Sequence, residues 1–277
     1  MQRAKMSRFK YLIIFVFAVF CLTSLHNCEK EHQGQHFYFV QITDTHFETG
    51  DNIARSHKAI ELINTLPMDI KCVVHTGDIT TADKLEEQEN RAYIDTALAI
   101  MGNINVPVHY VAGNHDIFPE KLETTTRIFK ENFGELISQV EYENVVFIFV
   151  FTEPLRKSFT VDGYDPLVEL EGYLKKAKAD GKPVIVFHHA PSVKDFYNNE
   201  YHSSWDKAVF EKWIKLLNDY EVKGVITGHY HRDEFHWLEN VPLYVSPPIS
   251  GWWGRQAAFR IYEFRDGKIG YRTQYLN

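Results

Sequence analysis

Five short clusters of polar residues combine side chains that could bind a metal ion or move a proton. The clusters supply imidazoles, carboxylates and one amide, and none of them contains a cysteine. In order along the chain they are Asp44-Thr45-His46, Gly77-Asp78, Gly113-Asn114-His115-Asp116, His188-His189-Ala190-Pro191 and Gly228-His229-Tyr230-His231. A ligand set of this kind favours Mn, Fe or Zn over a structural zinc–thiolate site.

The spacing inside the clusters points the side chains toward common centres. Residues i and i+2 of an extended chain project to the same side, so Asp44 and His46 face one centre together. The same spacing holds for His229 and His231. A carboxylate such as Asp78 has two oxygens and can bridge two cations, which divides the remaining ligands into two sets. The glycines that open three of the clusters permit tight turns that a Cβ atom would obstruct.

The elements that must position these clusters are predicted from the pattern of apolar residues. Strand-like and helix-like stretches alternate from residue 36 onward, which is the signature of an α/β domain. Strands are predicted over 36–42, 70–75, 106–111, 145–151, 183–187 and 222–227, and short strands over 235–237, 242–245, 258–264 and 268–275. Helices are predicted over 52–66, 85–101, 166–179 and in a segment that Ser204 caps. No linker-like segment interrupts residues 36–277, so we expect a single domain.

The clusters occupy equivalent places in this pattern, because each of them directly follows a predicted strand. In open α/β sheets, ligands collect outside the carboxyl ends of strands, where the loops leave room and the frame is rigid. Five clusters at five such ends therefore indicate one common site.

The same residues carry a resemblance to a known family. The series D-x-H, G-D, G-N-H-D, H-x-P and G-H-x-H, in that order, resembles the calcineurin-like metallophosphoesterase superfamily over residues 37 to about 231. Any one motif is weak alone, whereas all five in order are highly specific. From the segment Gln41-Ile-Thr-Asp-Thr-His46, the chain looks most similar to class III cyclic-nucleotide phosphodiesterases and their relatives. The resemblance implies an α/β fold that is a four-layer α/β/β/α sandwich of two mixed β-sheets flanked by helices.

The resemblance also implies which residues hold two metal ions. One ion would be held by Asp44, His46, Asp78 and His231, and the other by Asp78, Asn114, His189 and His229. We choose His189 over His188 because His189 has the family's H-x-P spacing to Pro191. His188 then has either a supporting role or none.

The chemistry implied by the resemblance is hydrolysis of a phosphate ester. Two cations about 3.5–4 Å apart lower the pKa of a shared water, so that hydroxide exists at neutral pH, and they hold the ester in line for attack. His115 would lie near the leaving group and give it a proton, with Asp116 orienting His115 and raising its basicity. Many relatives carry a further acid a few residues after G-D, where this chain has residues 79–83 ending in Asp83. That position is not a ligand in the family pattern.

Aromatic and basic residues near the expected mouth are candidates for substrate contacts. Trp252, Trp253 and Arg255 follow the fifth cluster, and His202 follows the fourth. One interpretation is a wall that stacks on a base or an apolar group of the substrate, with Arg255 near a phosphate. The other is a packed loop between the body of the domain and the last hairpin. Outside the proposed ligands, His75 is expected to support the loop that follows its strand.

The first 28 residues have the layout of an export signal. A basic stretch precedes the apolar run of residues 11–25, and these 15 residues are fewer than the roughly 20 that cross a bilayer as a helix. Cys28 resembles the acceptor cysteine of a bacterial lipoprotein signal, although Asn27 stands where Gly, Ala or Ser is usual. The alternative is an uncleaved short anchor. In either case we expect an exported, membrane-associated protein of the cell envelope, with a lipid anchor at Cys28 preferred.

Composition narrows the functional classes. The formal charge is −7, but the first 27 residues hold four basic residues and no acid. Without them, 26 basic and 37 acidic residues remain, and a formal charge of −11 is unsuited to binding a nucleic acid duplex. We therefore predict a dinuclear-metal hydrolase of small-molecule phosphate esters, a phosphodiesterase rather than a phosphomonoesterase of broad specificity. A catalytically idle envelope binding protein is the rival from another class, and a missing ligand would favour it.

Overall fold

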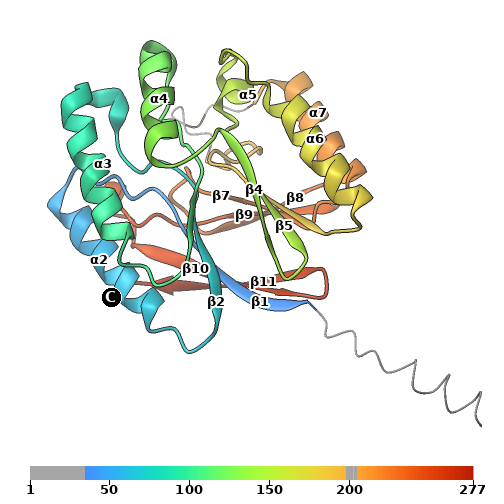
Figure 1. Ribbon diagram of the computed structural model, residues 1–277, viewed down its shortest axis with the longest axis horizontal. Helices are drawn as coiled ribbons and strands as arrows, with labels where there is room; N and C mark the ends of the chain where they lie inside the picture. Colours follow the sequence, from blue (N-terminus) through green and yellow to red (C-terminus); the bar gives the residue numbers. More distant parts are fainter. Residues whose placement is uncertain (1–34, 198–201, 203–204, 277) are drawn as a thin grey trace, which may run out of the picture. The chain divides into compact units, whose positions relative to one another are not determined.

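Helices are interspersed with the strands along the chain until residue 227, and mainly strands follow (Figure 1). The computed structural model describes residues 35–197, 202 and 205–276, so the signal and Cys28 lie outside the described residues. The strands are β1 (His36–Ile42), β2 (Ile70–His75), β3 (Val108–Tyr110), β4 (Ile137–Tyr142), β5 (Val145–Val150), β6 (Val184–Phe187), β7 (Gly224–Thr227), β8 (Glu234–Leu238), β9 (Val241–Val245), β10 (Ala258–Arg265) and β11 (Lys268–Tyr275). The α-helices are α2 (Gly50–Asn64), α3 (Glu87–Met101), α4 (Leu122–Asn132), α5 (Glu153–Lys157), α6 (Pro166–Ala179) and α7 (Lys207–Asp219). None of these helices is long and apolar enough to cross a membrane.

The strands form two mixed β-sheets. Five strands, in the order β11-β10-β1-β2-β3, make the first sheet, in which β1 runs parallel to β2 and antiparallel to β10. Six strands, in the order β4-β5-β6-β7-β9-β8, make the second sheet, whose inner pairs are parallel. Figure 1 shows α2 and α3 on one side of the sheets and α6 and α7 on the other.

Three hydrophobic cores separate these layers. The core between the sheets is aromatic: the ring of Phe39 lies 5.0 Å from that of Tyr262 and 4.9 Å from that of Phe147, between ring centres. On the outer face of the first sheet, the second core includes Ile63 of α2 together with residues of α3. On the outer face of the second sheet, the third core includes Trp213 of α7 together with residues of α6. The predicted four-layer α/β/β/α sandwich is therefore confirmed.

Strand β5 shows how the sequence builds these layers. Every residue of Val145–Val150 is buried. Alternate side chains belong to the inter-sheet core and to the core under α6, so the strand needs apolar residues on both faces. β-Branched and aromatic residues suit such a pleated, packed surface. The continuous apolar run therefore predicts a doubly buried strand correctly.

Two α-helices and one strand are missing from the prediction, and one helix cap differs from it. Helices α4 and α5 and strand β4 have no counterpart in it. The sequence of α4 includes three consecutive threonines, which are β-branched and disfavour helices. Phe129 of this helix nevertheless packs into the hydrophobic core on the outer face of the first sheet. The cap of α7 is Asp206, whose carboxylate accepts hydrogen bonds from the amides of Ala208 and Val209 at 3.0 and 3.2 Å. The predicted cap, Ser204, lies outside the described residues.

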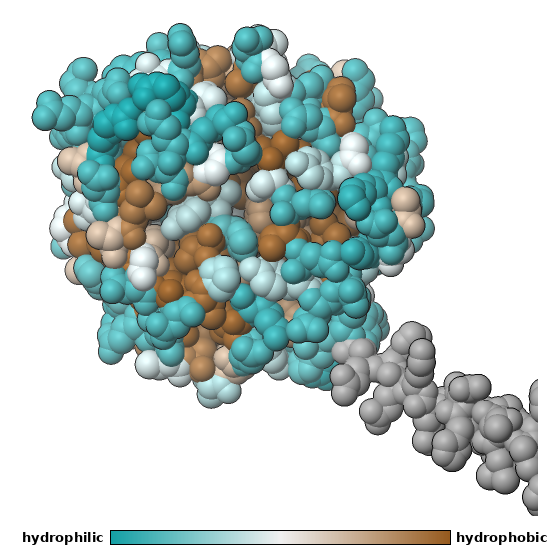
Figure 2. Space-filling view, in the orientation of Figure 1, coloured by the Kyte–Doolittle hydropathy of each residue, from teal (hydrophilic) through white to brown (hydrophobic). Residues whose placement is uncertain are grey.

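The surface of the domain is mainly polar. On the face that Figure 2 shows, hydrophilic residues cover most of the periphery, and apolar residues gather toward the middle. Among the described residues, eight large hydrophobic side chains are exposed, and all of them except Val168 are aromatic. The surfaces that carry these exposed aromatic residues are therefore candidates for contact with another molecule.

Candidate metal centre

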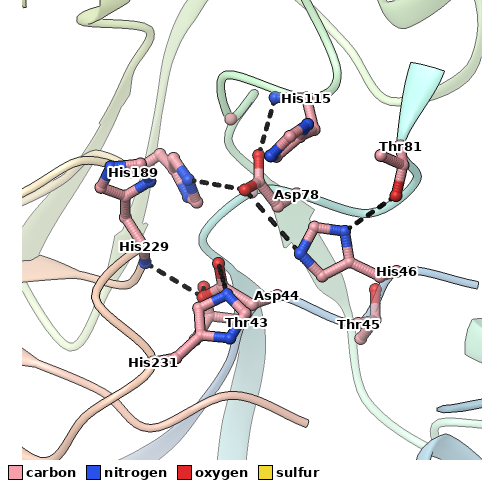
Figure 3. Close-up of polar contacts among 12 residues, drawn as sticks. Thr43, Asp44, Thr45, His46, Asp78, Thr81, His115, His189, His229 and His231 are labelled. Carbon is pink, nitrogen blue, oxygen red and sulfur yellow. Dashed lines mark hydrogen bonds and ion pairs between the residues drawn. The ribbon is translucent and has the colours of Figure 1, made fainter. Parts of the chain in front are cut away.

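The five sequence clusters meet where the carboxyl ends of strands from both sheets come together. β1, β2 and β3 of the first sheet lead into the first three clusters, and β6 and β7 of the second lead into the last two. The amide of Asp44 donates to the carbonyl of Gly77 at 3.0 Å, and the amide of Gly228 donates to the carbonyl of His189 at 2.9 Å. Figure 3 shows side chains from these loops pointing toward a common centre. The predicted convergence of the clusters is therefore confirmed.

The candidate ligand atoms form two adjacent groups. Asp44, His46 and His231 make the first group, and Asp78, His189 and His229 make the second. Within each group the ligand atoms lie within 4.8 Å of one another, and all six side chains are buried. Asp78 connects the groups, because its Oδ2 lies 3.1 Å from His189 Nε2 and 3.9 Å from His46 Nε2. A carboxylate in this position can bind one cation in each group.

The unpaired buried atoms of the centre fit a pair of metal ions. Within the described part of the chain, the Nε2 atoms of His46 and His229 and the Oδ1 atom of Asn114 are buried and have no hydrogen-bond partner. Each buried polar atom without a partner costs about 1–3 kcal/mol. Bound cations would remove this cost, and imidazole, carboxylate and amide ligands suit Mn, Fe or Zn.

The other ring nitrogen of two ligand histidines is held by the protein. His46 Nδ1 lies 3.2 Å from the hydroxyl of Thr81 (Figure 3). His189 Nδ1 lies 2.7 Å from the backbone carbonyl of Thr76. Because a carbonyl can only accept, the His189 Nδ1 carries a proton and its Nε2 is the atom left for a cation. The contacts made through Nδ1 therefore orient both rings toward the centre.

His75 supports the loops, as predicted, rather than joining the ligand groups. Its Nε2 lies 2.9 Å from the hydroxyl of Thr45, and its Nδ1 accepts a hydrogen bond from the amide of Gly77 at 3.2 Å. Burial lowers the pKa of His75 to about 3. A neutral imidazole therefore joins the first cluster to the second.

The carboxylates of the centre shift the pKa values around them. Burial opposes the charge of Asp78, but the neighbouring histidines outweigh it and lower the pKa of Asp78 well below its usual value. Burial lowers the pKa of His46 to about 3. At His189, the attraction of Asp78 outweighs burial and raises the pKa to about 10. A bound cation would take the place of this proton as the positive partner of Asp78.

The loops of the centre have an unusual backbone conformation. The φ angle is positive at Asp44 (52°), His46 (44°), Asp78 (54°), His229 (66°) and His231 (52°). This left-handed region costs a residue with a Cβ roughly 1–2 kcal/mol, and residues held in it cluster at functional sites. The glycines make room, as predicted: a Cβ on Gly113 would lie 2.2 Å from Asp78 Oδ1, and one on Gly228 would lie 2.0 Å from the hydroxyl of Thr43.

Asp116 does not orient His115, so that prediction is wrong. The Asp116 carboxylate accepts hydrogen bonds from four backbone amides, those of Gly113 and Asp78 at 2.8 Å, Ile79 at 2.9 Å and Thr80 at 3.2 Å. The reason is the turn after β3, in which the amide of Asp116 donates to the carbonyl of Gly113 and the carboxylate faces the β2 loop. Asp116 therefore ties two ligand loops together.

The partner of His115 is Asp83, which the sequence analysis did not select. His115 Nδ1 lies 2.6 Å from Asp83 Oδ1, and the His115 amide donates to Asp78 Oδ1 at 2.9 Å. Burial lowers the pKa of His115, but Asp78 and Asp83 outweigh it and raise the pKa above its usual value. Asp83 lies in the 3₁₀ turn Ala82–Lys84, shortly after the second cluster. The acid that follows the G-D motif in many relatives was the signal that could have identified it.

The two tryptophans predicted to contact substrate lie beside the first ligand group. The ring of Trp252 stacks on His46 with centres 3.9 Å apart, and the ammonium of Lys84 lies 5.7 Å from the centre of the Trp252 ring. Trp253 is 70% exposed, and its ring centre lies 4.7 Å from that of His231. Trp252 therefore packs on a candidate ligand, whereas Trp253 has an exposed ring beside the candidate centre.

His202 lies near the second group, and Arg255 is exposed beyond the tryptophans. The ring centre of His202 is 5.0 Å from that of His229, and its Nδ1 lies 2.6 Å from Asp195. Asp195 also pairs with Arg232, so a small charged network borders the centre. Arg255 caps the turn that holds the tryptophans.

The protein is thus a four-layer sandwich with two groups of candidate metal ligands at its strand ends, an arrangement that fits a metallophosphoesterase. The family model of the calcineurin-like phosphoesterases matches residues 37–233 of the chain. The chain therefore belongs to this family, whose members use two metal ions, and the predicted resemblance is confirmed.

Relatives with known names include two kinds of phosphoesterase. A Colwellia psychrerythraea protein named probable cyclic nucleotide phosphodiesterase is 27% identical over 211 residues, which cover 72% of this chain and 73% of that protein. The Mus musculus serine/threonine-protein phosphatase CPPED1 is 24% identical over 273 residues, covering 90% of this chain and 86% of that protein. A dimetal phosphatase from Danio rerio shares the fold, with a TM-score of 0.63 and 14% identity over 87% of this chain and 99% of its own.

Proposed function

We propose that the protein is a metal-dependent phosphodiesterase. The observation that carries the proposal is the convergence of buried ligand atoms in two groups around Asp78, with the ion pair of His115 and Asp83 beside them. Two bound cations would supply a hydroxide nucleophile near neutral pH and offset the negative charge of the phosphate. The protein's own side chains would bind the cations, orient the ester and deliver a proton.

We assign the ligands as two sets that share Asp78. One ion would be held by Asp44, His46, Asp78 and His231, and the other by Asp78, Asn114, His189 and His229. Support for Asn114 comes from its buried Oδ1 atom, which lacks a hydrogen-bond partner among the described residues. His188 belongs to neither set, because its ligand atoms are in neither of the two converging groups and its ring packs on Trp205 and Trp213. The donor types suit Mn, Fe or Zn.

His115 delivers the proton that the leaving group needs. With Nδ1 held by Asp83, Nε2 is the ring nitrogen left to donate this proton. The carboxylates of Asp83 and Asp78 favour the charged imidazole, which is the form that can donate. Such a donor matters most for an alkoxide, which leaves poorly without a proton.

The charges around the centre support a diester substrate over a monoester. Near neutral pH a phosphate monoester carries roughly −1.5 to −2 charge, whereas a diester carries a single negative charge. Arg232 is flanked by Asp195 and Glu234, and Asp83 places a further carboxylate beside the first ligand group. Because Arg232 and His115 are already paired with carboxylates, they add little positive potential that would favour a dianion over a monoanion.

A phosphomonoesterase of broad specificity is the second candidate. The observation that favours it is the mouse relative, which aligns over 90% of the chain and is named a protein phosphatase. Both candidates use the same ligands, so pocket shape and charge decide between them. A catalytically idle binding protein is disfavoured because each predicted ligand is present at the centre.

The test compares bis-nitrophenyl phosphate with nitrophenyl phosphate as substrates of the full chain, stripped of metal and then restored with Mn, Zn or Fe. We expect metal-dependent turnover that prefers the diester. A preference for the monoester would select the second candidate. If the protein binds two ions but hydrolyses neither ester with any metal, the result would select the third candidate, a catalytically idle binding protein.

We also propose that the chain is exported and anchored in the membrane through a lipid on Cys28. The layout of residues 1–28 supports this proposal. Labelling of cells with an alkyne fatty acid should mark the wild-type protein and leave Cys28→Ala unmarked. An unmarked wild-type protein in the membrane fraction would instead indicate an uncleaved anchor in residues 11–25.

A further inference from the structure

We propose that the groove between β8, β9 and the β10–β11 turn rests on the surface of a lipid bilayer. The groove has a volume of about 780 Å³, and its apolar lining includes Phe235, Trp237, Tyr244, Ile269 and Tyr271. None of the proposed metal ligands lines it. The inference rests on the proposed membrane anchor and is independent of the proposed hydrolysis.

Exposed aromatic side chains gather at this groove. Phe235 is 42% exposed, Trp237 61% and Tyr271 41%. Phe235 and Trp237 project from one face of β8, an edge strand of its sheet, with ring centres 5.4 Å apart. Tyr244 links the two walls, since its ring contacts those of Phe235 and Tyr271. Trp and Tyr rings prefer the interface between a membrane and water, where both an apolar body and a polar tip are satisfied.

The charged residues of the lining suit the same partner. Lys223 and Lys268 line the groove, and Glu221 is the acid among the lining residues. A lysine can lay its apolar stem along the groove and hold its ammonium at the level of lipid phosphates. This excess of basic over acidic groups favours an anionic lipid surface, although the domain as a whole is acidic.

The chain enters the domain beside this groove. The carbonyl of Gln35 accepts a hydrogen bond at 2.9 Å from the amide of Asp266, in the β10–β11 turn that forms one wall of the groove. Figure 1 shows the start of β1 beside this turn. Residues 26–34 separate the apolar run of residues 11–25 from Gln35 and span at most about 30 Å when extended. An anchor in that run, or at Cys28, would therefore hold the groove close to the bilayer. A short tether raises the effective concentration of a contact that is weak alone.

The groove and the metal centre lie at opposite ends of the same strands. The groove is lined by residues that directly precede β7, and Gln35 directly precedes β1. The ligand clusters follow the carboxyl ends of β1 and β7. A domain that rests on the groove would therefore turn its metal centre away from the bilayer. Soluble esters would reach the centre, whereas head groups of the anchoring bilayer would not.

The experiment places the full chain in vesicles of phosphatidylcholine and phosphatidylglycerol whose acyl chains carry bromine, which quenches tryptophan fluorescence on contact. Trp237→Phe removes the indole of the groove and keeps an aromatic ring. Trp253→Phe is the matched control, because Trp253 is similarly exposed but lies at the metal centre. We expect wild-type protein and the control to be quenched alike, and Trp237→Phe to lose about half or more of the quenching.

Equal quenching of wild-type protein and Trp237→Phe would overturn the proposal. So would a dimer of the detergent-solubilised protein that dissociates in Trp237→Phe, because the groove would then bind a second copy. Turnover of the nitrophenyl esters is measured on the same samples. Trp237→Phe should retain this turnover, so failure of the membrane contact is distinguishable from failure of the proposed hydrolysis.

Discussion

At the scale of single residues, the metal centre depends most on Asp78, whose carboxylate lies between the two ligand groups. Replacing Asp78 by alanine should lower both the metal content and turnover to background, because each ion loses a ligand. The domain should stay folded, since Asp78 belongs to none of the three hydrophobic cores. Metal analysis and ester hydrolysis check this, with the exposed Asp69→Ala as the matched control. Retained turnover in Asp78→Ala would contradict the assignment of the bridge.

Asp83 should affect the rate of hydrolysis through His115 rather than through metal binding. In Asp83→Asn the imidazole loses the carboxylate at 2.6 Å, so a charged His115 becomes less favourable. We expect kcat for alkyl esters to fall about 100-fold, while kcat for nitrophenyl esters, whose leaving group needs no proton, changes little. Metal content should be unchanged. Equal losses for both ester classes would argue against proton donation.

The candidate ligands could be predicted from the sequence better than the contacts that support them. Residue type and spacing predicted that Asp44, His46 and Asp78 lie in one centre. The reason is that residues following the carboxyl ends of neighbouring strands have few other places to lie than one common edge of the sheet. The partners of His115 were assigned wrongly, since the turn after β3 directs Asp116 back to backbone amides. That direction depends on the backbone path of two loops, which residue spacing does not specify.

At the scale of elements, close contact between loops should make Gly113 intolerant of a side chain. Gly113→Ala places a Cβ 2.2 Å from Asp78 Oδ1, so one loop must move and metal affinity should fall. Overpacking of this kind costs about 1–3 kcal/mol in unfolding free energy. Gly172→Ala in α6 is the control: its Cβ meets nothing within 4 Å, and it should stabilise by about 0.5–1 kcal/mol. Urea denaturation and metal titration measure both effects, and normal metal affinity in Gly113→Ala would contradict the expectation.

His75 should make the domain sensitive to acid. Burial lowers its pKa in the folded protein from 6.5 to about 3, so between these values the unfolded chain binds the extra proton. The stabilising contribution is complete above about pH 6.5 and is lost as the pH falls toward 3. Between pH 6.5 and 5, metal-free wild type should lose roughly 1.5 kcal/mol more than His75→Gln. Denaturation at both pH values measures this, with the exposed His57→Gln as control, and equal losses would refute it.

Elements with strong local signals were predicted well, and those that depend on tertiary contacts were not. β1, β2, β11 and α6 have the predicted bounds, because alternating or helical apolar patterns and Pro166 at a helix start are local features. α4 was missed because its threonines oppose a helix and only packing of its buried face compensates for them. β4 has an alternating burial pattern on a sheet edge, where polar residues weaken the strand signal.

At the scale of the whole molecule, metal binding should contribute to the stability of the fold. Ligands that bind only the folded state stabilise it by mass action. For one site the gain is about 2.7 kcal/mol when the free ligand concentration is 100 times the dissociation constant. Removal of metal should therefore lower the melting temperature of the domain, and addition of Mn or Zn should restore it. Scanning calorimetry with chelator and with metal checks this. An unchanged melting temperature would mean that the centre does not hold ions tightly.

The pairing of β1 with β10 governs when this chain can finish folding. His36 pairs with Arg265, so the first strand gains its second neighbour only from the last hairpin. Until that hairpin has been synthesised, β1 exposes an open edge and the core between the sheets lacks Tyr262. Pairings so distant in sequence form late, because loop closure opposes them. If the chain is exported from its N-terminus, as proposed, the last hairpin would pair with β1 only after the whole domain has crossed the membrane.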